Sequence, residues 1–213
     1  GGEGITSIED LKGKQVAYSS GTSSEDILVN SLTSVGLTMD DIEAIDMDAS
    51  GIVSAMLSGK VDAAATWSPN SLKILEEDAN ATKLADNMTF SDKTVSLASW
   101  ICMPSYAETN KDVLVKFTKA LYKAMDFASN PDNYDEVAGY VAQECGTDKE
   151  SALAQTGDGA WLDSATLLKY VGDGTIKGYY EVQQKNFIDN GDVESEVPVE
   201  DYVLFDVMEE AGK

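Results

Sequence analysis

The sequence predicts an α/β fold, in which a parallel sheet flanked by helices is followed by a mainly helical C-terminal segment. Three observations support this. Short apolar runs alternate with amphipathic helical patterns in the first part of the chain. The expected third strand, residues 61–66, is short and nearly all apolar, as a parallel strand covered on both faces is. No further β-period follows Met103. We therefore divide the chain into an α/β unit, residues 1–98, and a mainly helical remainder, residues 99–213.

Apolar periodicity and turn residues give the expected elements of the α/β unit in chain order. A short helical turn at residues 6–11 leads into the first strand. The strands are expected at residues 16–18, 41–47 and 61–66, and the helices at residues 23–35, 50–58 and 69–75. Because parallel strands are joined by right-handed crossovers, the strand ends meet at one edge of the sheet, where ligands of such sheets bind.

The helical remainder is expected to begin with one strand-like run, Val95–Met103, which Pro104 ends. Separate helices follow it. They are expected at residues 112–128, 134–143, 149–155, 163–170, 176–188 and 199–210. Amphipathic helices of this kind normally need a sheet to lie on, and no further strand is expected here to supply one.

The stretch after the first strand is the strongest candidate for a ligand site. Its residues are Ser19, Ser20, Gly21, Thr22, Ser23 and Ser24. A tight turn that opens a helix offers unpaired backbone N–H groups and the positive end of the helix dipole to a polar or anionic group. An ordinary helix cap at Ser23 or Ser24 would explain the same residue types, so both interpretations stay open for this stretch alone.

Two other strand ends are expected at the same edge, which favours the ligand interpretation. Asp48 and Ser50 follow the second strand, and Thr66 and Trp67 follow the third. The place of Trp67 favours a pocket wall over packing at the edge of a core. Trp100, in the run that leaves the α/β unit, is a further candidate, with hinge, pocket and core roles all open.

The charge of the chain restricts its partners. A formal net charge of -23 argues against nucleic acid and against an anionic membrane surface. All 15 basic residues are lysines, so bidentate arginine clamps and histidine chemistry are excluded. Cys102 and Cys145 could pair in an oxidising compartment or lie as small buried apolar side chains, and the sequence leaves both possibilities open.

No motif points to catalysis, to a metal or to a cofactor. Asp46 opens a run that resembles a calcium-binding EF-hand loop, but Leu57 stands at its twelfth position, where a glutamate is required. The phosphate-binding P-loop and the Gly-x-Ser-x-Gly motif of hydrolases are both absent. We therefore expect a protein that is not an enzyme and that needs neither a metal nor a cofactor.

Four stretches of the chain together form a pattern known from one family. They are Ile8–Tyr18, Gly21–Ser24, Ala49–Asp62 and Trp67–Pro69. They resemble the second lobe of ABC-transporter substrate-binding proteins of the nitrate, aliphatic sulfonate and taurine group, which have the periplasmic binding protein type II fold. The resemblance covers most of the chain and is weaker from Lys149 on.

This resemblance implies a solute-binding component of an ABC importer, which captures a small polar or anionic solute between two lobes and passes it to a membrane permease. The turn Gly21–Ser24 and Trp67 would face the cleft, while Ser68 stands where relatives often carry Asp. An extracytoplasmic place is implied, in the periplasm or at the outer face of the cytoplasmic membrane, with room for a lipid anchor before Gly1. The N-terminal half of the first lobe is expected to be absent. Two explanations stay open: the chain is truncated, or its copies form a homo-oligomer by exchanging segments that cover the exposed apolar faces.

Alternatives within and outside this family remain. Because arginine is absent, a neutral pyrimidine-type vitamin precursor stacked on Trp67 competes with a sulfonate or nitrate. The chain could instead be a truncated sensor or interaction domain of the same fold. Enzymes of pyrimidine biosynthesis share the fold but use a histidine of their own, which this chain lacks.

Overall fold

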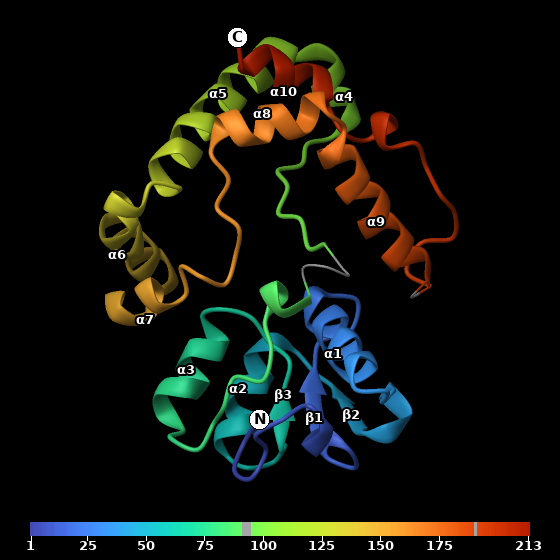
Figure 1. The fold of residues 1–213 in the computed structure, drawn as a ribbon, viewed down its shortest axis with the longest axis vertical. Coiled ribbons are helices and arrows are strands. Elements are labelled where there is room, and N and C mark those ends of the chain that lie inside the picture. The colour runs from blue at the N-terminus through green and yellow to red at the C-terminus, as the bar shows by residue number, and fades with distance from the viewer. Residues whose placement is uncertain (91–94, 190) are drawn as a thin grey trace. The chain divides into compact units, whose positions relative to one another are not determined.

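The structure, a computed structural model, describes residues 1–90, 95–189 and 191–213. The chain divides into two units, which are described separately below (Figure 1). Unit 1 consists of residues 1–91 and 141–158, and unit 2 of residues 92–140 and 159–213. Residues 141–158 thus group with unit 1, whereas the sequence analysis assigns them to the helical remainder.

Unit 1 is built on a three-stranded parallel sheet with the strand order β2-β1-β3. The strands are β1 (Gln15–Tyr18), β2 (Glu43–Asp46) and β3 (Ala63–Ala64). In the central strand, Tyr18 lies opposite Asp46 of β2, and Ala17 lies opposite Ala64 of β3. The predicted parallel sheet with its three strands is therefore present.

β3 is much shorter than the predicted strand at residues 61–66. Among the described residues it has a neighbouring strand on one side only. Its pairing continues by one hydrogen bond at each end, from Asp62 N–H to Gln15 O and from Ala65 N–H to Ala17 O, both at 2.8 Å. The strand therefore stops where its bonds to β1 stop.

Helices cover both faces of the sheet in unit 1 (Figure 1). They are α1 (Ser23–Ser34), α2 (Ala49–Leu57) and α3 (Asn70–Glu77). Successive side chains of β1 point to opposite faces. Val16 packs in one cluster with Leu32 of α1, whereas Ala17 packs in another with Ile52 of α2 and Ile74 of α3. The two clusters form the core that holds the strand ends in place.

The predicted stop of α1 at Gly36 is confirmed. This glycine has a φ of 77°, in the left-handed region that glycine adopts without strain. Its N–H donates to Thr33 O at 3.1 Å, and the N–H of Leu37 donates to Leu32 O at 2.9 Å. These two bonds make a Schellman motif, which satisfies the last carbonyl groups of the helix.

The predicted start of α1 at Ser23 is confirmed, whereas α2 begins one residue earlier and α3 one residue later than predicted. The residue that caps α1 is Thr22, whose side chain accepts a hydrogen bond from the Ser24 amide. Ser50 lies inside α2, which Asp48 precedes as the cap residue, and Pro69 precedes α3 rather than opening it. A cap depends on the local backbone angles, which residue type alone does not fix.

Unit 2 contains helices and no β-strand among its described residues. Its helices are α4 (Pro104–Thr109), α5 (Lys111–Ala128), α8 (Ser164–Gly172), α9 (Thr175–Asp189) and α10 (Phe205–Ala211). Two further helices lie between α5 and α8 in the sequence. α6 (Tyr134–Cys145) contributes to both units, and α7 (Lys149–Ala154) belongs to unit 1. α5, α8 and α10 lie side by side (Figure 1). Val115 and Tyr122 of α5 pack against Val207 and Ala211 of α10.

Short 3-10 turns complete the described secondary structure. They are Glu9–Leu11, Met39–Asp41, Asn87–Phe90, Pro131–Asn133 and Val199–Asp201. The first of them confirms the helical turn predicted before β1. The last one is separate from α10, which begins only at Phe205, so the single helix predicted at residues 199–210 is wrong.

The strand predicted at residues 95–103 is also wrong. This segment lies in unit 2, where no described strand is available to pair with it, and a strand requires a hydrogen-bonded neighbour. Its side chains are largely open to solvent, with Ile101 94% and Met103 71% exposed. An apolar alternating pattern alone therefore did not suffice to form a strand.

Cys102 and Cys145 are free and exposed, so the possibility that they lie as small buried side chains is wrong. None of the helices in the described ranges combines the length and the apolar character that a membrane span requires. The described residues also contain no group of three or more acidic or sulfur side chains arranged to hold a metal ion.

Candidate functional site

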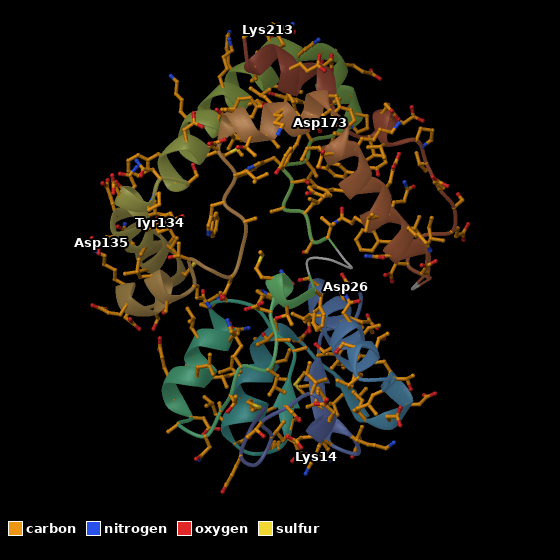
Figure 2. All side chains as sticks on the ribbon, viewed as in Figure 1. Lys14, Asp26, Tyr134, Asp135, Asp173 and Lys213 are labelled. Carbon is orange, nitrogen blue, oxygen red and sulfur yellow. The ribbon has the colours of Figure 1, made fainter. Side chains whose placement is uncertain are left out.

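The three strand ends form one edge of unit 1, which we call the carboxyl edge. It consists of residues 19–24 after β1, residues 47–50 after β2 and residues 65–68 after β3. Figure 2 shows Asp26, in the first turn of α1, at this side of the unit and Lys14, which precedes β1, at the opposite side. The predicted ligand-site residues of unit 1 therefore lie along one edge.

Side-chain hydrogen bonds tie the turn after β1 to both neighbouring strand ends. The N–H and the hydroxyl of Ser20 donate to the two carboxylate oxygens of Asp46, at 2.9 and 2.8 Å. The hydroxyl of Ser24 donates to the carbonyl oxygen of Ala65 at 2.7 Å. The turn is thus held rigidly, which lowers the entropic cost of binding a solute there.

Most amides of this turn already have acceptors within the protein, contrary to the prediction of unpaired N–H groups. The Ser19 N–H donates to the Ser24 hydroxyl at 3.0 Å, and the Gly21 N–H donates to the Glu25 carboxylate at 2.7 Å. Gly21 has a φ of 67°, which an L side chain rarely adopts. Ser24 is 1% exposed, so its hydroxyl serves the turn itself.

Two amides of the turn, those of Thr22 and Ser23, have no acceptor within the described residues. They stand at the N-terminus of α1, where the helix dipole favours a negative or polar group. Ser23 is also exposed. The free donors of the turn are therefore fewer than predicted but lie together.

Carboxylates give the carboxyl edge a negative character. Hydrogen bonds from the amide and the hydroxyl of Ser20 hold the pKa of Asp46 below its usual value. Burial, together with the charges of Glu25 and Asp46, raises the pKa of Tyr18. Because the lowered pKa keeps the Asp46 carboxylate ionised at neutral pH, the edge disfavours a solute with several negative charges and tolerates a neutral, zwitterionic or singly charged one.

Thr66 and Trp67 contribute the part of the edge that follows β3. The Thr66 hydroxyl oxygen is buried and has no hydrogen-bond partner within the described residues. Such a group costs free energy unless a bound molecule or water pairs with it. The Trp67 side chain is 39% exposed, so its ring is open to contact. After β2, Asp48 and Ser50 are exposed as well.

Trp100 belongs to unit 2, whereas the other predicted site residues belong to unit 1. It is 76% exposed, and its ring lies edge-to-face with that of Phe117 at a centroid distance of 5.4 Å. The structure thus shows an accessible aromatic side chain, and a role in solute binding stays a prediction.

The sequence did not indicate three polar residues that hydrogen-bond to the carboxyl edge. Asp46 ends β2 and Glu25 lies in the first turn of α1, so their positions at a strand end and a helix start could have indicated them. Gln155 accepts a 2.7 Å hydrogen bond from the hydroxyl of Ser68, 87 residues away in sequence. No local signal marks this third residue.

Comparison with known proteins places the chain in a family. The family model described as NMT1/THI5 like matches residues 1–134, more than half of the chain. The chain belongs to the NMT1/THI5-like family. This confirms the family resemblance inferred from the sequence.

Relatives of this NMT1/THI5-like chain carry binding-protein names. It is 29% identical over 205 residues to a binding protein of Brucella abortus, a match that covers 96% of this chain and 63% of the relative. It is 26% identical over 130 residues to the taurine-binding periplasmic protein of Escherichia coli, covering 60% of this chain and 40% of that protein. These names describe binding proteins and not enzymes, in agreement with the prediction. The chain thus spans 63% of the length of the Brucella relative.

A solved structure supports the predicted fold class. The periplasmic aliphatic sulphonate binding protein of Escherichia coli matches with a TM-score of 0.68 at 20% identity, covering 94% of this chain and 62% of that one. The alkanesulfonate-binding protein of Xanthomonas axonopodis, solved with MOPS bound, matches with a TM-score of 0.61 at 18% identity, covering 82% and 60% of the two chains. The α/β, periplasmic-binding-protein-like fold predicted for the NMT1/THI5-like chain is confirmed.

Proposed function

We propose that this chain captures a small polar or anionic solute at the carboxyl edge of unit 1, as the solute-binding component of an ABC importer. Sulfonates and taurine are the leading solutes, since the Escherichia coli relative is named for taurine and the structural neighbours for sulfonates. The observation that carries the proposal is the pair of free amides at Thr22 and Ser23. They would hold the oxygen atoms of the solute, while the exposed ring of Trp67 packs on its apolar part.

The proposed role in an importer implies particular partners and a particular location for the chain. The solute would pass to a membrane permease, and the net charge of -23 opposes any binding of nucleic acid. The periplasmic names of the relatives support an extracytoplasmic place for this chain too. A lipid anchor, nitrate as a solute and a homo-oligomer formed by segment exchange stay predictions from the sequence.

A second solute class is favoured by the electrostatics of the carboxyl edge. The side chains of Asp46 and Glu25 already accept hydrogen bonds from amides of the turn, and the chain has no arginine to balance an anion. A neutral pyrimidine-type vitamin precursor would avoid this repulsion and stack on Trp67. The two classes differ in charge, so a direct titration distinguishes them.

Calorimetric titration of the full chain with taurine, ethanesulfonate, nitrate and a hydroxymethylpyrimidine tests the proposal. We expect saturable binding of at least one of the four. Trp67→Ala should weaken that binding about tenfold, which corresponds to roughly 1.4 kcal/mol of lost ring contact.

Leu75→Ala is the matched control, because Leu75 of α3 is 40% exposed and Trp67 39% exposed. This variant should bind as the unchanged chain does. Absence of binding heat with all four solutes would refute the proposed function. Equal affinities of the Trp67→Ala and Leu75→Ala variants would show that Trp67 does not contact the solute.

A further inference from the structure

The segment that returns to unit 1 at residues 141–158 is fastened to it by side-chain contacts. The hydroxyl of Ser151 donates to the carboxylate of Glu76 in α3. The ammonium group of Lys83 lies 2.9 Å from the carboxylate of Asp158. These contacts fix the chain on either side of Gln155.

Gln155 reaches the carboxyl edge itself. Its side-chain oxygen accepts a 2.7 Å hydrogen bond from the hydroxyl of Ser68, which directly follows Trp67. The nitrogen of the same carboxamide has no acceptor within the described residues. Because a glutamine side chain has one acceptor oxygen and two N–H donors, the bond to Ser68 fixes the amide plane and leaves both donors available.

We infer that Gln155 is a solute-contacting residue that determines specificity at the carboxyl edge, and that its N–H groups donate to an oxygen of the solute. This inference rests on the proposed function. A neutral amide donor is well suited here, because the chain has neither Arg nor His. Together with the amides of Thr22 and Ser23 it would supply neutral donors, which pair with an acceptor group of the solute such as a sulfonate oxygen.

The substitution Gln155→Glu tests the donor directly. It keeps the oxygen that accepts from Ser68 and replaces the N–H groups by a second carboxylate oxygen. We expect calorimetry with taurine and ethanesulfonate to show a loss of affinity of about ten- to a hundredfold, as the loss of a hydrogen bond to a charged group predicts. Gln155→Met removes the donors without adding charge and should also weaken binding.

Gln143→Glu provides the matched control. It makes the same chemical change in the same returning segment, at an exposed residue of α6, and should change the affinity less than about twofold. Circular dichroism of each variant checks that the fold is kept.

The outcomes separate the inference from the proposed function. If the unchanged chain binds neither solute, the proposed function fails for sulfonates and the inference falls with it. If the unchanged chain binds but Gln155→Glu binds like Gln143→Glu, or binds more tightly, the donor role of Gln155 is refuted while the proposed function stands.

Discussion

Single hydroxyl groups decide the shape of the carboxyl edge. Ser24 is 1% exposed; its oxygen accepts from the Ser19 N–H, and its hydroxyl donates to the carbonyl of Ala65. It therefore joins the turn after β1 to the end of β3. Ser23, the next residue back, is exposed and makes no such bond. Two adjacent serines at one helix start thus differ: Ser24 fastens the turn, whereas Ser23 is exposed.

The substitution Ser24→Ala should destabilise the chain by about 1–3 kcal/mol, because it leaves the part-buried N–H of Ser19 and the buried carbonyl group of Ala65 unpaired. Ser23→Ala, at an exposed position, should change the free energy of unfolding by less than about 0.5 kcal/mol. Urea unfolding followed by circular dichroism measures both. Equal losses in the two variants would contradict the role assigned to Ser24.

At the scale of helices and strands, local patterns predicted most elements, because each pattern reflects the face that an element buries. Val16 and Ala17, for example, point to opposite helical layers as the sheet predicts. Predictions failed where a distant partner decides the outcome. Residues 95–103 have an apolar strand pattern but no described strand beside them, and β3 ends with its bonds to β1.

Ile52 tests the packing of α2 against the sheet. It is 0% exposed in the cluster that contains Ala17 and Ile74. Ile52→Ala should reduce the free energy of unfolding by about 2–5 kcal/mol through lost burial and a cavity. Leu75→Ala, on the exposed side of α3, should cost less than about 1 kcal/mol in the same denaturant titration. A small loss for Ile52→Ala would mean that α2 does not pack on the sheet as described.

At the scale of the molecule, the net charge and the composition argue against nucleic acid and an anionic membrane surface as partners. These properties can be read from the sequence without knowledge of the fold. The candidate site could be predicted only in part. The residue types predicted the turn after β1. Gln155 could not be predicted, because it reaches the site by a hydrogen bond to Ser68, 87 residues away in the sequence. The division into units likewise depends on long-range packing, because residues 141–158 group with unit 1. The chain also spans only 63% of the length of its Brucella relative.

The most direct test of the account is a nuclear magnetic resonance titration of the isotope-labelled chain with taurine and ethanesulfonate. The account predicts progressive shifts of the Thr22 and Ser23 amide signals and of the Trp67 indole signal. The amide of Lys14, at the opposite side of unit 1 (Figure 2), should not shift. Saturable shifts confined to other residues, with the amides of Thr22 and Ser23 unchanged, would contradict binding at the carboxyl edge.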